Sequence, residues 1–420
     1  MVKYLPRIVD AELDDLSAAP AVSIEGPRAI GKTETALRRA GTVHLLDDPE
    51  QLAVLAAAPR RVTAGDPPVL IDEWQRLPSS WDLVRRAVDA DSESSRFLLT
   101  GSTAPSEAPT HTGAGRIITV RMRPMSLAER RLSNPTVSLA ELLAGDHPDL
   151  EGDTSVGIEQ YADEITRSGF PGLRTQPDRV RSSLIDGYID RIVEHDIHRF
   201  GHTFRDRAAL RRWITAYAAT TSTATAFEKI RDAASPGEAN KTALKTAASY
   251  RSALEGLWMI EELPAWLPST NRLRRLASAP VHHMADPAIA ARLLGITSSM
   301  LLSGRAGLSG GRPLLGVLFE SLVTLSVRVY AQACEARVSH LRTHGDEHEI
   351  DLIVEQADGG IVALEVKLSP TVDDNDLRHL RWLAKRIGPQ LIDAAVITTG
   401  HHAYRRRDGI GVIPAALLGP

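Results

Sequence analysis

The sequence contains little that could cross-link the chain or anchor it in a membrane. Cys334 is the only cysteine among 420 residues, so no internal disulfide can form and a reducing cytoplasm is the expected compartment. The first residues, MVKYLPRIVDAELDDL, carry charges where a signal peptide needs its apolar segment. No uncharged apolar run approaches the ~18 residues of a membrane span. These absences favour a cytosolic protein without a membrane partner.

An excess of charge of one sign is also missing. The net charge is −4, so any contact with nucleic acid must come from local patches. Lysine is scarce, because only seven of the 49 basic residues are lysine, and a GC-rich coding sequence is the reading that we prefer for this bias. Arginines cluster between positions 199 and 212 and at 405–407. Neighbouring carboxylates dilute the first group, which is equally compatible with a solvated helix face.

The chain is too long for one ordinary core, and its pattern predicts three regions. In the first, residues 1–135, apolar runs at 22–24, 43–46, 69–71 and 97–99 predict strands, and 49–58 and 80–90 predict helices between them. Strands that alternate with helices indicate a parallel sheet covered on both faces, which is an α/β fold. The Pro-, Gly-, Ser- and Thr-rich residues 101–115 interrupt this pattern and predict a mobile loop.

The other two regions differ in pattern. Residues 155–300 predict helices, and the stretch 241–266 is compatible with a winged-helix-like unit as well as with any small helical bundle. Residues 311–420 return to a mixed α/β pattern. There we expect a helix over 314–332, strands over 350–355 and 360–367, a helix near 375–387 and a strand over 394–398.

A phosphate-binding loop follows the first predicted strand. The segment GPRAIGKT fits GxxxxGK[ST] at every fixed position. Its glycines let the loop fold around phosphates with backbone N–H groups pointing inward, Lys32 reaches the β- and γ-phosphates, and the hydroxyl of Thr33 binds Mg²⁺. The residues expected to contact ATP here are Gly26, Pro27, Arg28, Ala29, Ile30, Gly31, Lys32 and Thr33.

An acidic pair ends the predicted strand VLIDEW. Alone, Asp72 and Glu73 would be read as a solvated strand end. With the phosphate-binding loop present, we expect Asp72 to bind Mg²⁺ through its water shell and Glu73 to polarise the attacking water. The strand FLLTGS, with the small polar residues Thr100 and Ser102 at its end, is the third element of this site.

These segments together resemble a known family. GPRAIGKT, IDEWQ, LLTGS, AGRI (114–117), RPMSLAE (123–129) and SGFP (168–171) are similar, in order and spacing, to AAA-superfamily ATPases that carry a C-terminal domain of unknown function 4143. The departures are Ala29, where a Gln is common, and Trp74. The resemblance implies an ATPase core, a helical middle region and a nuclease-like end, without an agreed biological role.

The resemblance also implies roles for particular residues. In AAA-type ATPases a polar residue at the end of the third strand senses the γ-phosphate, so Thr100 and Ser102 are the two candidates. Arg116 is our candidate for an arginine finger, acting in cis or from a neighbouring subunit, with Arg123 as a second. Ordinary surface arginines are an equally good reading of both. The oligomeric state stays open.

The C-terminal segment EIDLIVEQADGGIVALEVK contains an Asp followed by Glu-x-Lys. Glu365 and Lys367 are two apart on one predicted strand and therefore project from the same face, and Asp351 lies on the strand before. This pattern resembles the PD-(D/E)xK nuclease core, in which two carboxylates hold Mg²⁺ or Mn²⁺ and the Lys acts in catalysis. Glu320, on the preceding predicted helix, matches an additional acidic ligand of such folds, and residues 345–349 are expected to form the turn. A solvated salt bridge is the competing reading of E-V-K.

Two functions from different classes follow from the sequence. The first is an Mg-ATP-driven switch acting on nucleic acid, with DNA favoured, and ending in a metal-dependent nuclease-like domain. The alternative is a non-nucleolytic, ATP-dependent interaction protein whose C-terminal domain only docks a partner or DNA.

Overall fold

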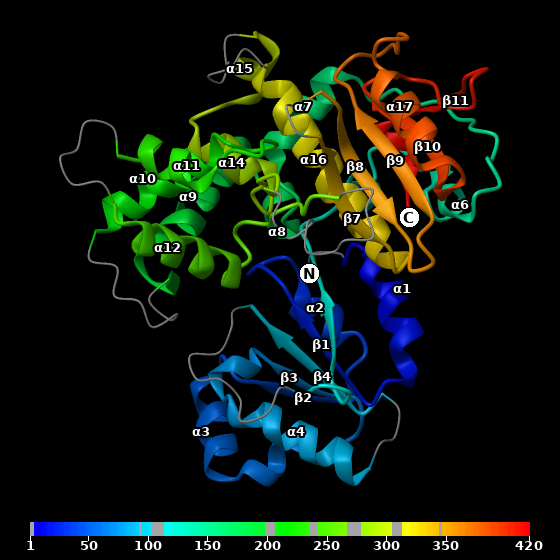
Figure 1. The fold of residues 1–420 in the computed structure, drawn as a ribbon. Coiled ribbons are helices and arrows are strands. Elements are labelled where there is room, and N and C mark those ends of the chain that lie inside the picture. Colours follow the sequence, from blue (N-terminus) through cyan, green and yellow to red (C-terminus); the bar gives the residue numbers. More distant parts are fainter. Residues whose placement is uncertain are drawn as a thin grey trace.

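The computed structural model describes residues 4–91, 95–102, 113–197, 206–235, 242–266, 279–304, 313–343 and 347–420. An N-terminal sheet, a helical region and a C-terminal sheet are its three parts, with the long helix α16 (Leu314–Ala333) running between them (Figure 1). The predicted boundaries 1–135, 155–300 and 311–420 remain a prediction.

The N-terminal sheet is parallel throughout. Its strand order is β2-β3-β4-β1-β5, with every neighbouring pair parallel. The strands are β1 (Ala21–Glu25), β2 (Thr42–Leu45), β3 (Val69–Asp72), β4 (Phe97–Gly101) and β5 (Ile118–Arg121). Because β4 lies between β1 and β3, the carboxyl ends of these three strands are neighbours, and ligands of open α/β sheets bind at that edge.

The N-terminal sheet is covered on both faces, as the strand pattern predicts. Val69, Ile71, Phe97 and Leu99 pack on one face with Trp81 of α4, whereas Leu70 and Leu98 face the larger core. This alternation is the period-two pattern of strands. The helices of this region are α1 (Ile8–Asp15), α2 (Lys32–Leu37), α3 (Pro49–Ala57) and α4 (Ser79–Ala90), with short 3-10 turns at Pro59–Thr63 and Trp74–Arg76. In the predicted loop, residues 103–112 lie outside the described part of the chain.

The middle of the chain is helical. Its helices are α7 (Ile158–Arg167), α8 (Pro171–Arg174), α9 (Asp178–Glu194), α10 (Arg207–Ala218), α11 (Phe227–Ala233), α12 (Leu244–Gly256), α14 (Pro287–Leu293) and α15 (Ser298–Leu302). Isolated antiparallel bridges join Ile260 to Met284 and Leu263 to Val281. The short helices α5 (Leu127–Arg130) and α6 (Leu139–Ala144) connect this part to the N-terminal sheet.

The C-terminal sheet is mixed, with strand order β11-β12-β10-β9-β8-β7. Its strands are β7 (Arg337–Arg342), β8 (Glu349–Glu355), β9 (Ile361–Val366), β10 (Leu391–Thr398), β11 (Tyr404–Arg405) and β12 (Gly411–Pro414). Pairs β7–β8, β8–β9 and β11–β12 are antiparallel, and β9–β10 and β10–β12 are parallel. One face packs on α16 and the other on α17 (Arg378–Ile387).

The helix α16 is the central core element. The hydroxyls of Ser326 and Tyr330 on this helix accept hydrogen bonds from the backbone N–H groups of Leu127 and Ala128, at 3.1 and 3.0 Å. Its length and composition would allow it to cross a membrane, but 89% of its apolar window is buried inside the protein. Core helices of soluble proteins pass the same test, so this helix is weak evidence for a membrane span.

The C-terminal end of the described chain also packs against the body of the protein. The last strand, β13 (Leu418–Gly419), pairs in parallel with β6 (Val137–Ser138), which precedes α6. The C-terminal sheet is thus joined to the segment that leaves the N-terminal sheet.

Candidate functional site

The loop between β1 and α2 has the backbone conformation that its glycines make accessible. A Cβ on Gly26 would lie 2.1 Å from the carbonyl oxygen of Met122, so only glycine fits there. Gly31 has a φ of +99°, in the left-handed region, immediately before α2 begins at Lys32. Ala29, one of the departures from the family pattern, also has a left-handed φ of +61°. A residue with a Cβ therefore holds a costly conformation within the phosphate loop.

Lys32 lies at the centre of this loop and is only 5% exposed. Its Nζ donates hydrogen bonds to the carbonyl oxygens of Gly26 and Pro27 at 3.0 and 2.7 Å. Burial lowers the pKa of Lys32 to about 8, against the opposing effect of the Glu73 and Asp72 carboxylates. A buried ammonium whose hydrogen bonds, within the described residues, go to neutral carbonyl oxygens would gain from a directly bonded anionic partner.

Asp72, at the end of β3, contacts both the start of α2 and the end of β4. Its Oδ1 accepts hydrogen bonds from the hydroxyl of Thr33, at 2.8 Å, and from the hydroxyl of Thr100. Burial raises the pKa of Asp72, and these two hydrogen bonds partly offset that rise. The Thr100 hydroxyl in turn accepts the N–H of Glu73 at 3.1 Å. The structure thus brings the hydroxyls of Thr33 and Thr100 to one carboxylate oxygen of Asp72.

Glu73 is positioned by two further side chains. Its backbone is left-handed, with a φ of +54°, and Oε2 accepts hydrogen bonds from Ser102 at 3.0 Å and from Gln75 at 2.5 Å. Ser102 is one of the two predicted sensor residues, whereas Gln75 was not predicted as a site residue. The signal for Gln75 is its place in IDEWQ, two residues after Glu73.

The candidate arginine fingers lie elsewhere. Arg116 is 48% exposed at its side chain and pairs with Asp89 of α4, Nε to Oδ1, at 2.8 Å. Arg123 binds Glu261 at 2.9 Å and donates to Gln332 at 2.6 Å, so it joins the helical region and α16. The structure does not bring either guanidinium to Asp72 or Glu73 within this chain.

A residue that the sequence analysis missed supports the phosphate loop from behind. The buried Arg7 donates to the carbonyl oxygen of Ile30 at 2.9 Å, to that of Arg123 at 2.7 Å, and to Glu129 at 3.0 Å. Glu129 also completes a capping box with Ser126 at the start of α5. In RPMSLAE the Ser and Glu therefore act structurally.

The predicted C-terminal residues lie together on one side of the second sheet. Lys367 Nζ donates to Glu365 Oε1 at 2.9 Å, and Asp351 Oδ2 accepts the N–H of Val366 at 2.7 Å. Glu365 is 3% exposed, and its second oxygen has no hydrogen-bond partner among the residues that the structure describes. Burial, and after it the Asp351 carboxylate, raise the pKa of Glu365 well above its ordinary value. For Lys367 burial lowers the pKa, but the two carboxylates outweigh it and the net change is a rise.

The third predicted metal ligand of this site comes from a different layer. Glu320 is buried on α16, and this helix covers the sheet face that carries Leu352 and Leu364. Glu365 follows Ile361 and Ala363 at every second position of β9, so it belongs to the opposite face, which α17 covers. Across the described ranges, no group of three His, Cys, Asp or Glu side chains is arranged to hold a metal ion. The ligand set Glu320, Asp351 and Glu365 therefore stays a prediction without a preformed three-residue site. Of the predicted turn 345–349, residues 345 and 346 lie outside the described part of the chain.

Two histidines that the sequence analysis did not name border this group. The Nδ1 atoms of His348 and His379 lie 3.4 Å apart, and the His348 ring stacks on Trp382 with centroids 4.1 Å apart. Burial lowers the pKa of His379, and Arg378, His348 and Lys367 add to that effect while Glu349 opposes it. His348 directly precedes β8 and His379 lies on α17, so the two become neighbours only in the folded protein.

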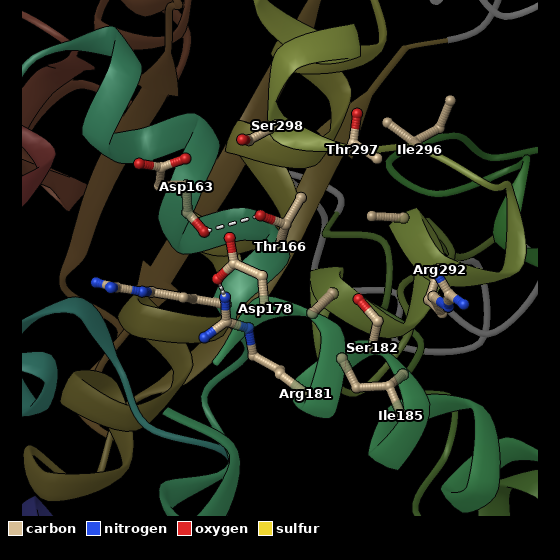
Figure 2. Close-up of a pocket in the computed structure, with 13 residues that line it drawn as sticks. Asp163, Thr166, Asp178, Arg181, Ser182, Ile185, Arg292, Ile296, Thr297 and Ser298 are labelled. Atoms are coloured by element: carbon tan, nitrogen blue, oxygen red, sulfur yellow. Dashed lines mark hydrogen bonds and ion pairs between the residues drawn. The ribbon is translucent and has the colours of Figure 1, made fainter. Parts of the chain in front are cut away.

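A separate cavity of about 230 Å³ lies in the helical region, between α7, α9, α14 and α15 (Figure 2). Its lining combines charged and hydroxyl side chains, among them Asp163, Arg181 and Ser182, with Ile185 on the apolar side. None of the residues predicted from the sequence lines this cavity.

Comparisons with known proteins identify the parts of the chain. Residues 18–130 match an AAA domain, residues 158–300 match domain of unknown function 8612, and residues 315–418 match domain of unknown function 4143. The uncharacterized proteins Mb2031c of Mycobacterium bovis and Rv2008c of Mycobacterium tuberculosis are each 25% identical over 95% of this chain and 81% of their own length. The Walker-type ATPase PABY2304 of Pyrococcus abyssi aligns over 68% of this chain and 94% of its own, with 15% identity and a TM-score of 0.39.

Proposed function

We propose that this chain, which carries an AAA domain followed by domain of unknown function 4143, is an Mg-ATP-dependent switch that acts on nucleic acid. The observation that carries the ATP site is the convergence of the Thr33 and Thr100 hydroxyls on Asp72 Oδ1, beside the buried ammonium of Lys32. ATP binding and hydrolysis belong to the AAA domain. We propose in addition that ATP switches the protein between two states and that its target is a nucleic acid.

The residues of the site fit a magnesium–nucleotide complex. A bound Mg²⁺ supplies charge neutralisation for the phosphates. The hydroxyl of Thr33 and the carboxylate of Asp72 are the groups that would hold it, and both are oxygen ligands of the kind Mg²⁺ prefers. Lys32 exchanges its two carbonyl partners for phosphate oxygens, which recovers part of the cost of burying its charge.

Glu73 is the proposed base for hydrolysis. Ser102 and Gln75 fix one of its oxygens, which leaves the other to orient a water. The Thr100 hydroxyl connects the backbone N–H of Glu73 to the carboxylate of Asp72, so a change at the phosphate site reaches both residues. This role supports Thr100 as the γ-phosphate sensor.

The C-terminal domain has two candidate roles. The grouping of Asp351, Glu365 and Lys367 supports a metal-dependent nuclease-like site, to which an Mg²⁺ or Mn²⁺ ion would supply a Lewis acid. The Glu365 oxygen that lacks a hydrogen-bond partner within the described ranges is the atom that such an ion would contact. The rival is a docking module for a partner or DNA, and the spread of Glu320 and Glu365 over two faces favours it.

The first experiment compares ATP binding and turnover in the wild type, Lys32→Ala and Glu73→Gln. Lys32→Ala should remove most nucleotide binding with the fold retained, and Glu73→Gln should bind ATP but hydrolyse it slowly. The exposed Lys385 of α17 provides a matched lysine control. If a folded Lys32→Ala protein binds ATP with the affinity of the wild type, the phosphate loop is not the ATP site.

The second experiment tests the C-terminal domain. Single- and double-stranded DNA and RNA are incubated with the protein, ATP and either Mg²⁺ or Mn²⁺. Cleavage that disappears in Lys367→Ala supports the nuclease. Binding of nucleic acid without cleavage, unchanged in Lys367→Ala, supports the docking module.

A further inference from the structure

The phosphate loop makes a direct ion pair with the helical region. Arg28 Nη1 lies 2.9 and 2.8 Å from the two oxygens of Asp196, which follows the end of α9. Arg28 keeps 28% of its side chain exposed, whereas only 3% of the Asp196 side chain is exposed. In Figure 1 α9 belongs to the green helical region and the loop precedes α2 in the blue N-terminal region. One residue of the nucleotide site thus neutralises a buried carboxylate of another part of the protein.

The charge of Arg28 acts on both sides of this junction. It lowers the pKa of Lys32, so the guanidinium lies within electrostatic reach of the ammonium that we assign to phosphate binding. It also opposes the rise that burial causes in the pKa of Tyr188 on α9. Arg28 therefore stands between the proposed phosphate position and α9, with a carboxylate as its present partner.

We propose that Asp196 occupies Arg28 in the nucleotide-free protein and competes with ATP phosphates for it. This inference rests on the proposed ATP binding. A guanidinium pairs with phosphate at least as well as with carboxylate, and a triphosphate brings several negative charges to the loop. When Arg28 turns to a phosphate, the Asp196 carboxylate loses the counter-charge that its burial requires.

An unpaired buried carboxylate is strongly unfavourable, so the turn that carries it must open to water or take up a proton. That turn, residues 195–197, directly follows the end of α9. The ion pair is then a latch through which nucleotide binding acts on the helical region. The latch favours the nucleotide-free state, and linkage requires that removing it tightens ATP binding.

The test uses Asp196→Asn, which keeps the shape of the side chain and removes its charge. The affinity for a non-hydrolysable ATP analogue with Mg²⁺ should rise about tenfold, within the roughly 5- to 150-fold range of such couplings. The matched control is Asp186→Asn, also on α9, whose carboxylate pairs with Arg292 of α14 rather than with the phosphate loop. The control should leave the affinity unchanged.

A double-mutant cycle isolates the pair. Arg28→Gln should weaken analogue binding, and adding Asp196→Asn to it should bring no further tightening. Unchanged or weaker affinity in Asp196→Asn, with normal analogue binding in the wild type, overturns the latch. Absence of analogue binding in the wild type, equal to that of Lys32→Ala, instead overturns the proposed ATP site.

Hydrogen exchange in the wild type gives a readout that does not depend on any variant folding. The amides of residues 192–197 should exchange faster with the analogue and Mg²⁺ than without them. Equal or slower exchange there, in protein saturated with the analogue, also overturns the latch.

Discussion

The lowered pKa of Lys32 makes nucleotide affinity depend on pH in a defined window. A pKa of about 8, against an ordinary value of 10.5, means that the surroundings of Lys32, with burial as the largest cause, disfavour the ammonium by about 3 kcal/mol in the nucleotide-free protein. Phosphates require the charged form. Below pH 8 the ammonium is already present, so affinity should be flat. Above pH 8 binding must take up a proton, and affinity should fall about tenfold per pH unit, reaching about a tenfold loss at pH 9 relative to pH 7.

The same group affects the stability of the nucleotide-free protein with the opposite sign. Between pH 8 and 10.5 the unfolded chain holds a proton on Lys32 that the folded protein has released. Stability from this group therefore rises as the pH rises through that window. Titration of Lys32 therefore does not unfold the protein at pH 9, and weaker ATP binding at that pH must have another cause than such unfolding.

Calorimetry can measure both the affinity and the proton. Titrations of the ATP analogue with Mg²⁺ at pH 7, 8 and 9, in buffers of different ionisation enthalpy, should show uptake of nearly one proton at pH 9. Lys32→Arg is the control, because a guanidinium stays charged throughout and its profile should be flat. Equal affinity at pH 7 and 9 in the wild type, or the same slope in Lys32→Arg, would refute the reasoning.

Further predictions concern other parts of the structure. Glu73→Gln should slow single-turnover ATP hydrolysis by ~10²-fold while the analogue Kd stays within about twofold, and unaltered turnover would assign the base elsewhere. Gly26→Ala should destabilise the N-terminal sheet by about 1–3 kcal/mol in denaturant unfolding, because its Cβ collides with the Met122 carbonyl, and wild-type stability would contradict the close approach. Because the pKa of Glu365 is raised, its ionisation should cost stability as the pH rises above 4.5, and Glu365→Gln should remove that part of the Tm profile.

The grouping of the candidate nucleotide-site residues could be predicted because its signals are local. The loop GPRAIGKT and the strand end IDEW each lie within eight residues, and the parallel order of β1, β4 and β3 brings them together. The predicted strands and helices of both sheets match the observed ones to within about three residues. The strand β7 was missed because its sequence, RVSHLR, is charged at both ends, and β5, ITVR, because it closely follows a loop-like segment.

The residues that support the site could not be predicted, because their partners are distant in sequence. Arg7 reaches Glu129 across 122 positions and Arg28 reaches Asp196 across 168. No spacing rule links such pairs, and a buried ion pair looks like two surface charges until the fold encloses it. Glu320 shows the reverse case, since the helix carrying it was predicted and the face of the sheet that it covers was not.

A second route from the nucleotide site leads to the C-terminal sheet through the end of β5. The carbonyl oxygen of Met122 lies close to Gly26, and its backbone N–H donates to the carbonyl oxygen of Glu25 at 2.8 Å. Met122 is therefore fixed to the base of the phosphate loop. The flanking Arg121 and Arg123 both pair with Glu261, at 3.0 and 2.9 Å.

Glu261 in turn connects these arginines to α16. Burial alone would raise the pKa of Glu261, but Arg121, Arg123 and Arg328 of α16 together lower it, so the carboxylate stays charged among three guanidiniums. Gln332, also on α16, donates to the carbonyl oxygen of Arg121 at 2.8 Å. A cluster of contacts of this kind can transmit a displacement only if its side chains can also pair in a second, distinct conformation. The Arg28–Asp196 pair has a partly exposed guanidinium and a competing anion, so it is better suited to switching than this buried cluster. The buried cluster is better suited to fixing the end of β5 against α16.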